Sequence, residues 1–181
     1  MEAKTVNFSR TTITELMIPA FANFSGKVHG GILLSLMDKV AYVVAAKHAG
    51  TYCVTVSVEG VEFREPVEVG ELVSLYASVN FVGNTSMIIG IRVESLKPKT
   101  GEVKHTNSCY FTMVAKDDEG NLVQVPELIL ESKDDIRRFY DAFKLREKRH
   151  EISRILDKEL KQMSLDKMKE KIAMNRCQID L

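Results

Sequence analysis

Hydrophobic residues between Gly30 and Ala49 recur at helical spacing and occupy most sides of the helix that they predict. Gly50 follows in the position of a C-terminal capping residue. A helix that is apolar nearly all round is buried on most sides, so we expect this one to lie at the centre of the fold. Its narrow polar stripe consists of Ser35, Asp38, Lys39 and Tyr42.

Alternating apolar and polar residues predict strands on both sides of this helix. Thr5–Met17 predicts a strand before it, and four stretches predict strands after it: Tyr52–Val58, Val73–Phe81, Met87–Val93 and Val103–Lys116. Gly60 suggests a bulge, beyond which Val61–Phe63 continues the first of these four strands. In the second, Val73, Leu75, Ala77, Val79 and Phe81 are expected to share one face. The short connections predict an antiparallel meander.

The chain changes character after Gly120. From about Ser132 to the end it is rich in charged residues, with apolar residues at helical spacing and Ser132 or Asp134 as a candidate N-cap. We therefore expect an α+β domain over residues 1–125 and a C-terminal helical extension over residues 126–181. The apolar stripe of the extension is expected to pack on the sheet or on a neighbouring subunit, since one helix leaves much of a sheet uncovered.

Composition excludes several classes of protein. The net charge is zero, with 25 acidic and 25 basic residues, which argues against a nucleic-acid partner. No apolar run is long enough to cross a membrane, and the N-terminus has no signal-peptide pattern. The three cysteines form no CxxC pair, which indicates reduced thiols and a cytoplasmic location.

The motifs of several common enzyme classes are missing from the sequence. The four histidines are scattered without metal-ligand spacing, so no metal is expected. GxSxG, P-loop and GxGxxG motifs do not occur, which disfavours serine hydrolases, P-loop nucleotide enzymes and dinucleotide oxidoreductases.

Three spaced motifs carry a resemblance to a known family. They are Asn23-x-x-Gly26-x-x-x-Gly30-Gly31 followed by Asp38, then Val61-x-Phe63-x-x-Pro66-x-x-Val69-Gly70-Glu71, and Gly83-Asn84-Thr85-Ser86-Met87. Together they resemble the hotdog-fold acyl-CoA thioesterases of the acyl-CoA hydrolase family, over residues 7–116. His29 departs from this branch, which more often has an aromatic or apolar residue there, although HGG is common in the wider hotdog superfamily.

The resemblance implies a hotdog fold, in which an antiparallel sheet wraps around one long central helix. It also implies homodimers, often assembled as hexamers (trimers of dimers), and hydrolysis of acyl-CoA to free fatty acid and coenzyme A. No cofactor is expected, because coenzyme A is part of the substrate and product. The length of the acyl chain is not predicted.

Asp38 is the leading catalytic candidate. A carboxylate on a largely buried helix is desolvated, which makes it a stronger base. It would either activate water or attack the thioester directly, and both routes stay open. The alternative is an acid on the exposed stripe of the helix, or one paired with a lysine.

The other candidate residues lie near the helix start and in one hairpin. Asn23 would orient water or bind the thioester carbonyl, by resemblance working with Asp38 of a partner subunit; otherwise it forms a turn. The Gly31 N–H is the expected oxyanion donor at the helix N-terminus, with Gly30 and His29 as neighbours that contact substrate. The turn Asn84, Thr85 and Ser86 would hold a phosphate or pantetheine oxygen. Candidate phosphate-binding cations are Arg64, Lys97, Lys99 and Lys104.

Two alternatives to a thioesterase use the same fold. One is a non-catalytic acyl-CoA sensor, for which only the C-terminal region could house a second module. The other is an acyl-thioester hydratase or dehydratase, whose usual pairing of a histidine with an acid fits the spacing of Asn23 and Asp38 less well.

Overall fold

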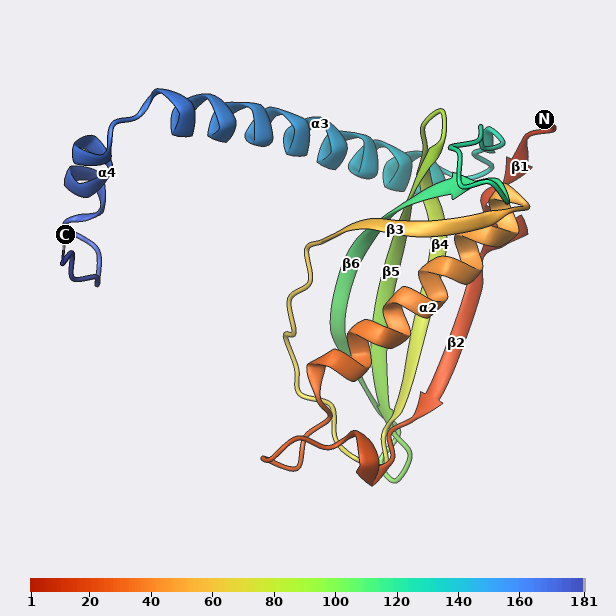
Figure 1. Cartoon of the computed structure of the whole chain (residues 1–181). Coiled ribbons are helices and arrows are strands. Elements are labelled where there is room, and N and C mark those ends of the chain that lie inside the picture. Colours follow the sequence, from red (N-terminus) through yellow and green to blue (C-terminus); the bar gives the residue numbers. More distant parts are fainter. Residues whose placement is uncertain (181) are drawn as a thin grey trace. The chain divides into compact units, whose positions relative to one another are not determined.

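A five-stranded antiparallel sheet curves around one long helix in the computed structural model, which describes residues 1–180 (Figure 1). The strand order is β2-β4-β5-β6-β3, so β3 lies at one edge of the sheet. This arrangement confirms the predicted α+β hotdog fold. The elements of the sheet and its helix are β2 (Thr11–Leu16), α2 (Gly30–Ala49), β3 (Tyr52–Glu59), β4 (Leu72–Val82), β5 (Ser86–Lys97) and β6 (Glu102–Lys116).

The chain divides into two compact units, Met1–Ala142 and Phe143–Leu181. The first contains the sheet, α2 and the short elements β1 (Lys4–Thr5), α1 (Val6–Ser9), η1 (Pro19–Phe21) and β7 (Leu128–Ile129). The boundary falls within α3 (Lys133–Gln162), so residues 126–142 group with the sheet. The second unit holds the rest of α3 and α4 (Leu165–Ile172). Among the described residues, none of the helices combines the length and apolar character that a membrane span requires.

Helix α2 has the predicted bounds, Gly30–Ala49, and Gly50 ends it in the left-handed conformation (φ 75°). Its buried face packs on the concave side of the sheet and consists of Leu33, Leu36, Met37, Val40, Ala41, Val44, Ala45 and His48. The expectation of burial on most sides is wrong for the single chain, because the opposite face is exposed. That exposed face includes Leu34, Ser35, Asp38, Lys39 and Tyr42.

Alternation along β4 holds only as far as Val79. Val73, Leu75, Ala77 and Val79 are buried in the core against α2. A bulge between Val79 and Phe81 adds one residue and reverses the alternation, so the prediction that Phe81 shares the face of the other four is wrong, although Phe81 is buried. Its ring instead lies 5.0 Å from the ring of Phe139 on α3. The bulged residue, Asn80, is buried and hydrogen-bonded to Ser78.

Two further local predictions are wrong. Val6–Ser9 forms a helical turn within the predicted first strand, because the Thr5 hydroxyl accepts the Phe8 N–H and caps it. Gly60 marks the end of β3 rather than a bulge, since β3 stops at Glu59. The bulge in this strand lies between Thr55 and Ser57.

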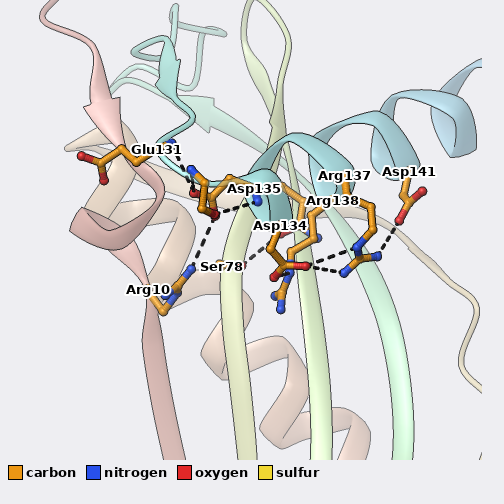
Figure 2. Close-up of polar contacts among 10 residues, drawn as sticks. Arg10, Ser78, Glu131, Asp134, Asp135, Arg137, Arg138 and Asp141 are labelled. Carbon is orange, nitrogen blue, oxygen red and sulfur yellow. Dashed lines mark hydrogen bonds and ion pairs between the residues drawn. The ribbon is translucent and has the colours of Figure 1, made fainter.

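The start of α3 is fixed by a buried carboxylate, Asp135 (Figure 2). Asp135 Oδ2 accepts the Ser132 N–H at 3.0 Å, and Ser132 Oγ accepts the Asp135 N–H at 3.1 Å. This reciprocal pair is a capping box, and it confirms Ser132 as the N-cap. Arg10 approaches Asp135 to 3.6 Å, while Asp134 instead pairs with arginines on the next turn of α3. The capping box and the Arg10 contact join the proximal turns of α3 to the first unit.

Candidate active site

Asp38 lies on the exposed face of α2, opposite the edge strand β3. The Thr55 hydroxyl donates a hydrogen bond of 2.6 Å to Asp38 Oδ1. Asp38 is exposed, so the expectation that it is desolvated is not met within one chain. The bond to Thr55 orients the carboxylate and occupies one of its oxygens. Among residues 1–180, no partner is found for Oδ2, which leaves this oxygen free for a reacting group.

A cavity of about 570 Å³ opens beside this pair. It lies between α2 and β3 and is lined by Asp38, Lys39, Tyr42, Val43, Tyr52, Cys53, Val54, Thr55 and Met113. A volume of this size suits a small-molecule ligand. Cys53 is not a competing nucleophile, because burial raises the pKa of its thiol to about 11 and keeps it protonated at neutral pH.

Two aromatic rings explain the double glycine at the start of α2. The His29 ring caps the helix, with Nδ1 accepting the Gly31 N–H at 2.9 Å. A Cβ on Gly31 would lie 3.0 Å from that nitrogen, so glycine is what lets the ring lie there. A Cβ on Gly30 would lie 3.4 Å from the Phe63 ring. The motif thus accommodates both rings against the helix end.

This cap changes which backbone group is available to a substrate. The Gly31 N–H, which the sequence favoured as the oxyanion donor, already donates to His29. For the Gly30 N–H, the part of the chain that the structure describes offers no hydrogen-bond acceptor. The first N–H of the helix is therefore the one free to bind an oxygen.

Asn23 lies in the loop before α2 and organises that loop. Its Oδ1 accepts the Ser25 N–H at 2.9 Å, the Ser25 hydroxyl at 2.7 Å and the Lys27 N–H at 3.1 Å. These three contacts of Oδ1 agree with the alternative prediction that Asn23 forms a turn. Among the described residues no acceptor is found for its Nδ2 group, which remains a donor, so one side chain can serve both roles.

Asn84, Thr85 and Ser86 lie in the hairpin between β4 and β5, whose register places them beside the end of β6. The carbonyl of Asn84 accepts the Val125 N–H at 2.9 Å, and that of Thr85 accepts the Ala115 N–H at 3.0 Å. Within one chain the hairpin and the start of α2 lie at opposite ends of the sheet (Figure 1).

The candidate phosphate-binding cations differ in how closely they pair with acidic side chains. Lys97 lies 3.8–3.9 Å from the carboxylates of Glu68, Glu71 and Glu102. The hydrogen bond from Lys27 holds the pKa of the Glu68 carboxyl below its ordinary value. Arg64 is more exposed and reaches Glu62 at 3.8 Å. Among the described residues, no group of three or more His, Cys, Asp or Glu is placed to hold a metal ion.

Thr55 is the residue that sequence reasoning missed. It lies in a strand pattern where threonine is common for its shape alone, and nothing local distinguishes it. Only the packing of α2 across β3 brings its hydroxyl to Asp38.

Comparisons with known proteins match this architecture. The model of the Thioesterase superfamily matches residues 25–102. Protein VdlD of Helicobacter pylori is 44% identical over 145 residues, covering 80% of this chain and 83% of that protein. An uncharacterized acyl-CoA thioester hydrolase of Zymomonas mobilis is 38% identical, covering 64% of this chain and 78% of that protein. The human cytosolic acyl coenzyme A thioester hydrolase is 34% identical, covering 78% of this chain but 38% of its own length.

Solved structures agree with the sequence matches. An apo-hexameric acyl-CoA thioesterase superposes with a TM-score of 0.81 and 33% identity, covering 84% of this chain and 98% of that one. An acyl-CoA hydrolase of Staphylococcus aureus, solved with butyryl coenzyme A and coenzyme A, has a TM-score of 0.77 and 27% identity, covering 87% of this chain and 96% of that one.

That Staphylococcus aureus hydrolase was also solved as three variants, in which an asparagine, an aspartate and a threonine are each replaced by alanine. The three replaced residues are spaced 15 and 17 positions apart along that chain. Asn23, Asp38 and Thr55 have the same residue types at the same spacing.

Proposed function

This chain belongs to the hotdog-fold acyl-CoA thioesterases of the thioesterase superfamily, and we propose that it hydrolyses acyl-CoA to a free fatty acid and coenzyme A through Asp38. The observation that carries the proposal is the hydrogen bond from Thr55 to Asp38, which orients a carboxylate beside a cavity. Named relatives that act on acyl-CoA thioesters support the substrate class.

In the proposed reaction, the carbonyl carbon of the thioester is attacked with the help of the Asp38 oxygen that Thr55 leaves free. As a general base, Asp38 removes a proton from a water that attacks this carbon. As a nucleophile, it forms an anhydride that water then opens. In both routes the carbon–sulfur bond breaks, coenzyme A leaves as the thiol, and the fatty acid is released after one water is consumed. The general-base route puts the oxygen of water on the fatty acid, and the anhydride route does so when water attacks the acyl carbon.

Negative charge develops on the carbonyl oxygen as the attack proceeds. We propose the Gly30 N–H of a second copy of the chain as the donor that stabilises it, because within one chain Gly30 lies about 12 Å along α2 from Asp38, too far to meet at one carbonyl group. This N–H is free and lies at the positive end of the α2 dipole. His29 then has a positioning role, since its cap on Gly31 holds the first turn of the helix in place. Release of the Gly31 N–H by rotation of the His29 ring would add the second donor that the sequence favoured.

We propose that Asn23 completes the site from a second copy of the chain, donating through Nδ2 to the attacking water or to the carbonyl. The exposed Asp38 face of α2 and the unpaired edge of β3 leave room for such a partner. A hexameric structural neighbour supports assembly of copies, which we propose to be a trimer of dimers. The turn of Asn84, Thr85 and Ser86 is proposed to bind coenzyme A, and the name of the human relative supports a cytosolic location.

Release of thiol from acyl-CoA, followed with a thiol reagent, tests the activity. Asp38→Asn keeps the size of the side chain and its hydrogen bond with Thr55, and removes the carboxylate. We expect a loss of at least about a hundredfold in kcat, the usual contribution of a catalytic base. Asp134→Asn, an exposed acid on α3, is the matched control and should keep full activity. Binding of acyl-CoA with no thiol release would contradict the proposal and favour a sensor.

A further inference from the structure

The cavity beside Asp38 continues as a strip between α2 and β3. Val43, Cys53 and Val54 line it beyond the carboxylate, and Met113 lies beside Thr55. These four side chains carry no charge at neutral pH, whereas Asp38 and Thr55 mark the end where the thioester is proposed to react. An apolar lining that starts at the reacting carbon fits the acyl chain of the substrate.

Two tyrosines meet at the far end of this strip. Tyr42 is one turn beyond Asp38 on the same face of α2, and Tyr52 is the first residue of β3. Their ring centroids lie 6.1 Å apart with an interplanar angle of 58°, within the range of favourable aromatic pairs. Both residues line the cavity, and Tyr52 is the lining residue of β3 farthest from Thr55, so the pair lies at the end away from Asp38.

Element geometry gives the length of the strip. Four helical residues from Asp38 to Tyr42 advance by about 6 Å. Three strand residues from Thr55 to Tyr52 advance by about 10 Å. An extended alkyl chain advances by about 1.25 Å per carbon, given its bond lengths. The strip therefore accommodates roughly five to eight carbons beyond the thioester.

We propose that the Tyr42–Tyr52 pair sets the acyl-chain length, so that this protein prefers short and medium acyl groups. The inference rests on the proposed thioesterase function. A longer chain meets the two rings and has to displace them, which costs the energy of the aromatic pair and of its packing. Shorter chains fill the strip and gain affinity with each added carbon.

The test compares kcat/KM across acyl-CoAs from butyryl to palmitoyl. For the wild type, kcat/KM is expected to rise to about octanoyl and then fall. Tyr42→Ala and Tyr52→Ala should each raise the ratio of dodecanoyl to hexanoyl turnover about tenfold, because the end of the strip opens. Tyr42→Phe keeps the ring and should keep the wild-type profile. Tyr76→Ala is the matched control, since Tyr76 is similarly exposed (44% against 41% for Tyr42) but does not line this cavity.

A profile that is flat from butyryl to palmitoyl, or one that both alanine variants leave unchanged, overturns the inference while thiol release still supports the proposed function. Binding of non-hydrolysable thioether analogues, measured by calorimetry, separates the two claims when no thiol is released. An affinity that rises with acyl-chain length up to about eight carbons in the wild type, and keeps rising beyond eight carbons in Tyr42→Ala, supports the role of the tyrosine pair independently of catalysis. Equal affinities in the wild type and both variants overturn it.

Discussion

Replacing Thr55 with valine removes the hydroxyl that orients Asp38 and keeps a β-branched side chain of the same shape. A hydrogen bond to a charged group contributes about 1.5–3 kcal/mol in protected settings. Asp38 is exposed in the single chain, so solvent screening reduces this to about 1 kcal/mol. If that energy orients the carboxylate for reaction, Thr55→Val lowers kcat by roughly fivefold.

Thiol-release kinetics with saturating acyl-CoA measures kcat and KM separately. We expect KM to change by less than about twofold, because Thr55 holds the catalytic group rather than the coenzyme A moiety. Thr14→Val is the matched control: its hydroxyl bonds Ser74 at 2.9 Å on β2, away from the cavity, and its loss should leave kcat unchanged. An unaltered kcat in Thr55→Val would refute the positioning role.

Three further predictions concern stability. Burial lowers the pKa of His48 below its ordinary 6.5, so as pH falls the unfolded chain takes up the proton before the folded chain does. The free energy of unfolding should therefore fall as pH drops below about 6.5. Melting temperatures from pH 8 to 5 should show this fall, and His48→Gln should make it smaller. Asp135→Ala removes the buried carboxylate of the capping box and should cost about 1–2 kcal/mol in urea unfolding, whereas equal losses in the half-exposed Asp134→Ala would argue against a special role for the capping box. Gly90→Ala drives a Cβ into the buried amide of Asn80 and should cost about 1–3 kcal/mol; no recovery on combining it with Asn80→Ala would contradict the steric cause.

Long periodic elements were predictable because their signals are local. The apolar spacing predicts the extent of α2, and Gly50 predicts its C-terminal end. Interruptions of the strands, such as bulges, were not predictable, because they depend on tertiary packing. The bulge at Asn80 turns Phe81 toward Phe139, some sixty residues later in the chain. Likewise, nothing in the sequence distinguishes the helical turn at Val6–Ser9 from the start of a strand.

Candidate site residues were found by motif, and their contacts only by structure. The spacing of the motif identified Gly30 and Gly31 but gave no sign that the His29 ring occupies one of the two N–H groups. The apolar pattern around Asp38 suggested desolvation, whereas a single copy buries only one side of α2. We expect a second copy to supply the missing cover.

The claim that one active site is built from two copies has a direct test. Asp38→Ala and Asn23→Ala chains are each expected to be inactive. In a dimer that combines one chain of each kind, one site has both residues intact and the other has neither. Random mixing of equal amounts should therefore restore about a quarter of wild-type thiol release. Mixtures that form heterodimers but stay as inactive as either variant alone would contradict the shared site.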